Sequence, residues 1–188
     1  MSIDTLNSLI GTLNKSPLKD HADAIGMVCV LWSKLEMYLD VLFVGLLDTD
    51  PETMAAILSN MKMKDKIGAI RSIGHAKKPS DSWYTQLDKI LIEVDTVLRL
   101  KRNRLVHDYW FVSENTVLQA QMMAKVIKPQ SRQTAALYQR VEEITVGEIV
   151  ALQVMILSAT NKLLNVIKSR GHPSSCLLYT SPSPRDRG

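Results

Sequence analysis

The stretch IGMVCVLWSKLEMYLDVLFVGLL, residues 25–47, decides the fold. Its apolar side chains recur at intervals of three and four residues, which is the period of an α-helix. They are Ile25, Val28, Leu31, Trp32, Leu35, Leu39, Leu42, Phe43 and Leu46. The other side of the same helix carries Val30, Met37, Val41 and Val44. A helix that is apolar nearly all round is buried on several sides. We therefore expect one long helix over about 19–47, in the core or in a subunit interface.

Two short helices and a second long helix are predicted to follow. Asp50 before Pro51 is typical of an N-cap with Pro at the first helical position, so a helix is expected from 51 to about 60. Another is expected over 63–73, ending near Gly74. The second long helix should begin after Pro79, with Ser80 or Asp81 as its N-cap, and continue to the basic end at 99–107. Its apolar stripe is Leu87, Ile90, Leu91, Val94, Val97, Leu98 and Leu105.

The period of the pattern changes to two after Trp110, which indicates strands. Residues 109–112 should pair with 117–127 in a hairpin whose turn contains Glu114 and Asn115. Residues 135–143 are predicted as a third strand or an extended segment. Thr145 and Glu148 form a capping box for a last helix over 146–169. The fold class is therefore mainly α, a helical bundle of two long and several shorter helices with a small β-hairpin inserted before the last helix.

The composition supports one soluble domain. The chain has 188 residues, of which 46% are hydrophobic, enough for a core but too little for two large domains. We expect an N-terminal segment over 1–18, one helical domain over 19–170 with the hairpin insert at about 109–127, and a disordered tail over 171–188. Charged side chains interrupt residues 25–47, and the first residues do not resemble a signal peptide, so we expect no membrane association.

Two cysteines, Cys29 and Cys176, cannot form a disulfide framework, and neither lies in a cluster with metal-ligand spacing. The sequence therefore favours a reducing cytoplasm, and it predicts no metal and no cofactor. The segment CLLYTSPSPRD, residues 176–186, resembles a translated adapter of fragmentation-based sequencing libraries, one codon choice for which encodes all eleven residues. We interpret residues 176–188 as an artefact; the alternative is a genuine Ser/Pro-rich disordered tail.

Positive charge is concentrated in the middle of the chain. Residues 61–107 carry 11 basic and 5 acidic side chains, whereas residues 1–60 carry 3 basic and 8 acidic ones. Clustered charge matters more for a polyanion than the total, so this third of the chain is the candidate surface for nucleic acid. A charge-rich helix can also be simply a solvated face.

The segment KRNRLVHDYW, residues 101–110, is the one place where other potentially catalytic side chains lie close to a histidine in the sequence. It combines a permanently charged guanidinium with a carboxamide and an imidazole that exchanges a proton near neutral pH. His21, His75 and His172 are interpreted as solvated. The alternative for His107 is structural, because the C-terminus of a helix attracts basic residues and Arg104 with Asp108 makes an ordinary surface pair.

Arg102 and His107 do not share a face of an ideal helix. Five residues place them about 140° apart, whereas Asn103 and His107, four residues apart, lie on the same face. For Arg102 and His107 to meet on one phosphate, the helix must break at Val106 or the arginine must come from another subunit.

Residues 102–107, RNRLVH, resemble the R-x4-6-H signature of HEPN domains (higher eukaryotes and prokaryotes nucleotide-binding), including the polar residue directly after the Arg. The helical context over about 19–110 is similar as well, while the hairpin after Trp110 departs from the simplest HEPN bundle. The resemblance implies a HEPN-like helical bundle that acts as a homodimer, in which the Arg and His of two protomers meet.

The resemblance further implies a metal-independent endoribonuclease that leaves a 2′,3′-cyclic phosphate, in a toxin, phage or defence system with a cognate antitoxin. His107 would be the general base, Arg102 would stabilise the transition state, and Asn103 would orient the phosphate or the imidazole. Lys101 and Arg104 would bind the RNA substrate, or else belong to a solvated face. The main alternative is a non-catalytic HEPN-like dimer that binds protein or RNA. A DNA-binding regulator has only the basic middle segment in its favour.

Overall fold

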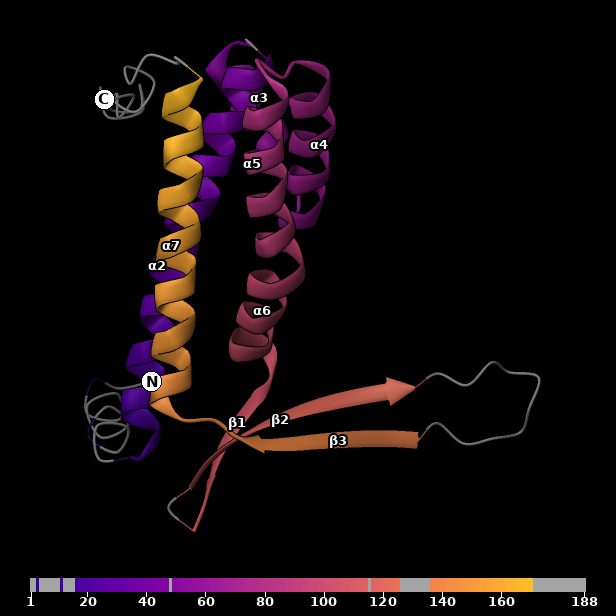
Figure 1. Cartoon of the computed structure of the whole chain (residues 1–188). Coiled ribbons are helices and arrows are strands. Elements are labelled where there is room, and N and C mark those ends of the chain that lie inside the picture. The colour runs from indigo at the N-terminus through magenta and orange to yellow at the C-terminus, as the bar shows by residue number, and fades with distance from the viewer. Residues whose placement is uncertain are drawn as a thin grey trace, which may run out of the picture. The chain divides into compact units, whose positions relative to one another are not determined.

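The computed structural model describes residues 3, 11, 16–47, 49–114, 116–125 and 136–170 (Figure 1). The chain is mostly helical with one three-stranded antiparallel sheet, which confirms the mainly α fold class. Most of the predicted N-terminal segment and the whole predicted tail, residues 171–188, lie outside the described residues. In chain order the elements are α2 (Leu18–Leu47), α3 (Pro51–Leu58), α4 (Met63–Ala76), α5 (Asp81–Glu93), the π-helix η1 (Val94–Leu98), α6 (Arg99–His107), β1 (Tyr109–Ser113), β2 (Thr116–Lys125), β3 (Ala136–Glu143) and α7 (Val146–Ser169).

The chain packs as two compact units. Unit 1 contains residues 1–32 and 96–156, and unit 2 contains residues 33–95 and 157–188. That residues 19–170 form one domain stays a prediction.

The predicted helix starts are confirmed by their caps. The Asp50 carboxylate accepts a hydrogen bond from the Thr53 backbone N–H at 2.8 Å, and Ser80 Oγ accepts one from the Trp83 N–H at 3.1 Å. At the start of α7, the Glu148 N–H donates to Thr145 Oγ1 at 3.2 Å, while the Glu148 carboxylate accepts from the Thr145 N–H at 2.8 Å. Each cap satisfies a backbone donor that the first helical turn leaves unpaired.

Helix α4 does not end near Gly74 as expected but continues to Ala76. Gly74 is buried inside the helix, where α4 packs against α5. A Cβ atom at this position would lie 3.2 Å from Leu87 Cδ2 of α5, tighter than ordinary contact. The glycine is therefore explained by the close approach of two helices rather than by a helix end.

A π-helical turn interrupts the second long helix of the prediction. Between α5 and α6, residues Val94–Leu98 form η1. Three of these five residues, Val94, Thr96 and Val97, are β-branched, and such side chains crowd the preceding turn of an α-helix. The wider π-turn coincides with this β-branched run.

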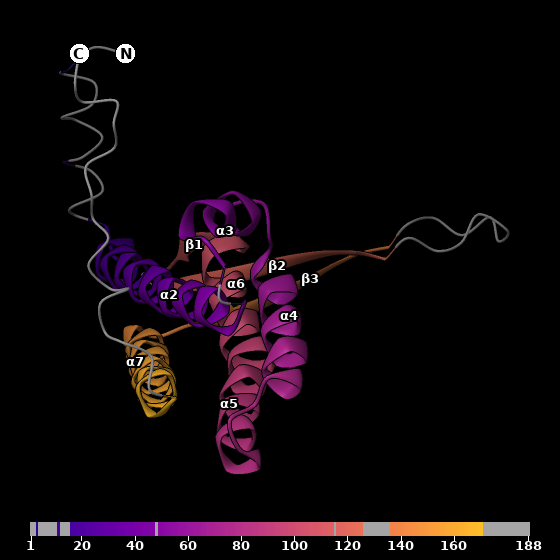
Figure 2. The same cartoon turned by 90° about the horizontal axis from the view of Figure 1, so that it is seen from above.

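The sheet has the strand order β1-β2-β3, with Tyr109 opposite Ala120 and Ala120 opposite Val141. This confirms the hairpin and decides for a strand at 136–143. The turn between β1 and β2 contains Glu114, whose φ is 49°. Because β2 is longer than β1, its second half pairs only with β3, and the two strands continue beyond β1 as a ribbon (Figures 1 and 2).

Unit 1 has a core between its helices and one face of the sheet. The buried side chains that form it are Ala24, Val28, Trp32, Leu98, Leu105, Val117, Ile149, Leu152 and Ile156. Gln153 of α7 donates to the Ala24 carbonyl of α2 at 2.9 Å, and Gln119 of β2 donates to the Arg104 carbonyl of α6 at 2.8 Å. The buried amides thus connect helix to helix and sheet to helix.

Unit 2 has a core of its own, formed by α3, α4, α5 and the remaining parts of α2 and α7. Trp83 Nε1 donates to the Val166 carbonyl at 2.9 Å. Lys66 is buried and its ammonium donates to the Asp40 carboxylate of α2 at 2.7 Å.

Helix α7 is long and apolar enough to cross a membrane by length and composition alone. In the structure it supplies core residues from both ends, among them Ile149, Ile156 and Leu163. A core helix of a soluble protein passes the same test, so this helix is compatible with the predicted solubility.

Candidate functional site

The predicted site lies in unit 1, where α6 ends and the sheet begins. Helix α6 has nine residues and ends at His107, after which Asp108 adopts an extended conformation that leads into β1. The Asp108 N–H donates to the Arg104 carbonyl at 3.0 Å and so closes the last turn. The Leu105 side chain is buried and anchors this end of the helix in the core. Trp110 Nε1 donates to the Leu105 carbonyl at 2.9 Å.

Arg102 is half-buried against Trp32 of α2. Its guanidinium carbon lies 5.9 Å from the centroid of the Trp32 ring, within range of a cation–π interaction. One terminal nitrogen donates to Asn103 Oδ1 at 3.3 Å, and Nε is buried with no hydrogen-bond partner in the described part of the chain. No carboxylate among the described residues pairs with Arg102, so its charge is not neutralised there.

Arg104 has a different environment, because two carboxylates hold it. Its Nε donates to Asp108 at 3.2 Å and a terminal nitrogen donates to Glu142 of β3 at 2.8 Å. Burial lowers the pKa of Arg104, but the hydrogen bonds to Glu142 and Asp108 outweigh it and the net shift is upward. The same contact lowers the pKa of Glu142. An RNA phosphate would have to compete with both carboxylates for Arg104. The geometry therefore favours the alternative that Arg104 forms surface ion pairs, and its binding of RNA stays a prediction.

Lys101 and His107 are both exposed. Lys101 lies close enough to the start of α7 for its charge to contribute to the lowered pKa of Glu148, whose main cause is the hydrogen bond from the Thr145 backbone. His107 makes no hydrogen bond or ion pair with any residue that the structure describes. Its imidazole is therefore accessible from solvent.

The structure tests one of the two arrangements that would bring Arg102 and His107 together, namely a break of the helix at Val106. Helix α6 is continuous through Val106 and includes His107, so the helix does not break between the two residues. Arg102 packs against Trp32 while His107 is exposed to solvent, and no contact joins them within the described residues. Of the two arrangements that would bring both groups to one phosphate, a break at Val106 is not found. An arginine from another subunit stays a prediction.

His21 was interpreted as solvated, and this was wrong. It is half-buried in unit 1, where Nε2 lies 2.8 Å from the Ile144 carbonyl and therefore donates to it. Its ring lies 6.1 Å from the ring of Trp110. The other nitrogen, Nδ1, is buried and has no partner within the described ranges. These contacts join positions 21, 110 and 144, and no local pattern in the sequence signals such a distant pairing.

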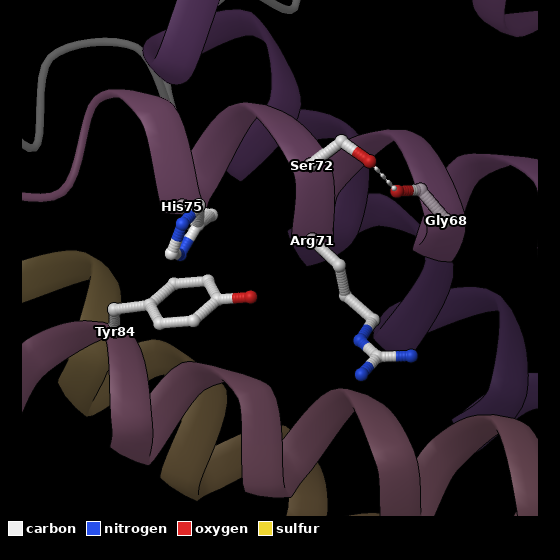
Figure 3. Close-up of a pocket in the computed structure, with 5 residues that line it drawn as sticks. All are labelled: Gly68, Arg71, Ser72, His75 and Tyr84. Carbon is white, nitrogen blue, oxygen red and sulfur yellow. Dashed lines mark hydrogen bonds between the residues drawn. The ribbon is translucent and has the colours of Figure 1, made fainter.

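Unit 2 has a shallow polar pocket between α4 and α5, with a volume of about 590 Å³ (Figure 3). Its lining residues are Gly68, Arg71, Ser72, His75 and Tyr84. The His75 ring packs edge-on against the Tyr84 ring at 5.0 Å. Arg71 Nε donates to Asp88 at 2.6 Å, so the cation of this pocket is already paired. This pocket could not be predicted from the sequence, because its residues come from two separate helices.

Within the described residues, no group of three or more His, Cys, Asp or Glu side chains is arranged to hold a metal ion. Comparisons of the chain with protein-family models, with curated proteins and with solved structures found no match. The function therefore has to be argued from the residues at the end of α6.

Proposed function

We propose that the protein is a metal-independent endoribonuclease of the HEPN type that acts as a homodimer. The observation that carries this proposal is the contrast between two neighbouring arginines. Arg104 is neutralised by two carboxylates, whereas Arg102 lies on Trp32 with no carboxylate partner among the described residues. A buried or half-buried charge without a counter-ion is costly unless something compensates it. An RNA phosphate would supply that compensation.

The chemistry needs a base and an electrostatic stabiliser from the protein. His107 takes the proton from a ribose 2′-hydroxyl, and the 2′-oxygen forms a bond to the adjacent phosphorus. The bond from phosphorus to the 5′-oxygen breaks, and that oxygen takes a proton from water to become a hydroxyl. The guanidinium of Arg102 offsets the negative charge that develops on the phosphoryl oxygens. The products are a 2′,3′-cyclic phosphate and a 5′-hydroxyl end.

Asn103 has a supporting role in this proposal. Its Oδ1 accepts the hydrogen bond from Arg102, so its amide orients the guanidinium, and its NH₂ group remains available to a phosphate oxygen. Lys101 is exposed at the same helix end and would attract the RNA backbone. If this endoribonuclease is a toxin, it also requires a cognate antitoxin as its partner.

Separate His107→Ala and Arg102→Ala substitutions test the mechanism. We expect each to reduce cleavage of single-stranded RNA by at least about 100-fold, since general base catalysis and electrostatic stabilisation each contribute on that scale. Cleavage by the unchanged protein should survive EDTA and leave cyclic phosphate ends, which mass spectrometry of the fragments identifies. Arg99→Ala is the matched control, one turn earlier on the same helix. Unchanged cleavage by both variants as folded proteins would rule out this mechanism.

A second candidate function is a non-catalytic helical module that binds protein or RNA. The packing of Arg102 on Trp32 favours it, because the same contact can serve stability alone. Thermal or chemical denaturation separates the two. A structural role for Arg102 and His107 predicts that alanine at either site lowers the free energy of unfolding by more than about 2 kcal/mol, whereas ordinary surface changes stay within about 0.5 kcal/mol.

A further inference from the structure

The outer face of the sheet carries an exposed tyrosine and a half-buried phenylalanine shortly after His107. Residues alternate between the two faces of a strand, so the run Tyr109-Trp110-Phe111 is divided between them. Trp110 points toward the helices of unit 1, where it contacts His21 and the Leu105 carbonyl. Tyr109 and Phe111 point the other way, and Tyr109 is 64% exposed.

The register of the sheet extends this outer face across all three strands. Tyr109, Ala120 and Val141 form one row, and Phe111, Leu118 and Glu143 form the next. Val141 is exposed as well, while Ala120 between these two larger side chains is small and only 2% exposed. The result is an apolar surface with an aromatic edge, and it lies on the side of the sheet opposite to the core.

This face adjoins the proposed cleavage site. The Cα atoms of His107 and Tyr109 are two residues apart and hence separated by at most about 7 Å. A nucleotide whose phosphate lies at His107 therefore has its neighbour within reach of Tyr109.

The charges described on this part of the sheet are of both signs. Glu143 lies in the row of Phe111 on the outer face, whereas Glu142 is on the inner face and pairs with Arg104 and Arg140. The exposed ring of Tyr109, rather than charge, is therefore the feature that could hold a base.

We infer that Tyr109, with Phe111 beside it, is a stacking platform for the unpaired bases of single-stranded RNA next to the cleaved phosphate. Aromatic side chains on an open sheet face bind bases in this way because every base offers a planar π surface, whereas paired bases in a duplex are not available. The inference rests on the proposed function and adds to it a residue that binds the bases of the substrate.

The test measures binding separately from cleavage. In a His107→Ala background, fluorescence anisotropy with a short labelled oligouridine gives the Kd of each variant without loss of the probe. Tyr109→Ala should weaken binding by about tenfold, since stacking on one aromatic side chain contributes on that scale. Tyr109→Phe and Tyr109→Trp should keep most of the affinity. An RNA duplex of the same length should bind more weakly and be insensitive to Tyr109→Ala.

Val112→Ala is the matched control, because Val112 lies on the same strand, faces the other side of the sheet and is partly exposed. It should leave the Kd unchanged. Circular dichroism of each variant checks that the fold persists, as expected for an exposed Tyr109.

Three results would overturn the inference: no binding of the oligouridine at all, an equal Kd for Tyr109→Ala and its parent, or a change of oligomeric mass on Tyr109→Ala with no change in Kd. The last would identify the face as a contact between protein copies. The proposed function fails differently, namely when His107→Ala and Arg102→Ala still cleave RNA. In that case a loss of affinity in Tyr109→Ala would still support the stacking platform.

Discussion

At the scale of single residues, the partners of a charged side chain decide what it can do. Arg71, Arg104 and Arg140 each pair with a carboxylate, and Arg102 is paired with none among the described residues. Spacing along the chain indicates the pair of Arg104 with Asp108, which are four residues apart. It does not indicate the pair of Arg71 with Asp88 or that of Arg104 with Glu142, because those carboxylates come from other elements. That Arg102 pairs with no described carboxylate likewise follows from the packing and not from its place in the segment 101–110.

The ion pair between Lys66 and Asp40 gives a residue-scale prediction about stability. The Lys66 side chain is 10% exposed, whereas that of Asp40 is 35% exposed. Removing Asp40 therefore leaves a buried ammonium without a counter-charge, while removing Lys66 leaves a carboxylate that water can still reach. We expect Asp40→Ala to lower the free energy of unfolding by about 2–3 kcal/mol and Lys66→Met by about 1 kcal/mol or less. Urea denaturation measures both.

Glu36 provides the control for this pair. It lies one turn before Asp40 on α2 and makes no hydrogen bond or ion pair with the residues that the structure describes. Glu36→Ala should therefore change the free energy of unfolding by less than about 0.5 kcal/mol. Equal losses for Asp40→Ala and Lys66→Met would show that the burial of Lys66 does not govern the pair.

At the scale of elements, helix starts were predictable because their signals are local. The capping residues Asp50, Ser80 and Thr145 lie within three residues of the backbone groups that they bind. The end of α4 and the π-turn of η1 were not predictable, because they depend on what lies beside the helix. Gly74 is typical of a helix end in the sequence, and only the proximity of Leu87 explains its place inside one.

The capping box of α7 predicts a pH dependence. Thr145→Ala removes the acceptor for the Glu148 N–H and should cost about 1 kcal/mol of the free energy of unfolding at neutral pH. Hydrogen bonds from the Thr145 backbone and hydroxyl lower the pKa of Glu148 below its ordinary value of 4.5. A carboxylate with a lowered pKa stabilises the fold above its unfolded-state pKa, and this contribution is lost as the pH falls through the folded-state value.

Glu148→Gln isolates this pH-dependent part. The difference in thermal stability between it and the unchanged protein should be present at pH 7 and shrink below about pH 4. Glu143→Gln, an exposed carboxylate on β3, serves as the control. A difference that stays constant from pH 7 to acid would mean that the charge of Glu148 does not contribute to the cap.

At the scale of the whole molecule, the proposed mechanism requires Arg102 and His107 to come from two different chains. The sequence analysis predicted the residues of the site and the geometric conflict between Arg102 and His107, since both follow from the period of a helix. How a second copy would resolve this conflict could not be read from the sequence, because an interface depends on surfaces from distant segments. Unit 1 has exposed apolar side chains on α2 and α7 where another chain could pack, namely Met27, Val30, Val150 and Val154.

Complementation between two inactive variants tests whether the arginine comes from the partner copy. A dimer that combines one Arg102→Ala chain with one His107→Ala chain has one site with both groups intact and one site with neither. Co-expressed with different affinity tags and purified on both, this mixed dimer should recover about half of the cleavage rate of the unchanged dimer, because symmetry gives two equivalent sites. Differently tagged copies of Arg102→Ala alone should stay inactive. If Arg102 and His107 acted within one chain, every site in the mixed dimer would lack one of them and no activity would return.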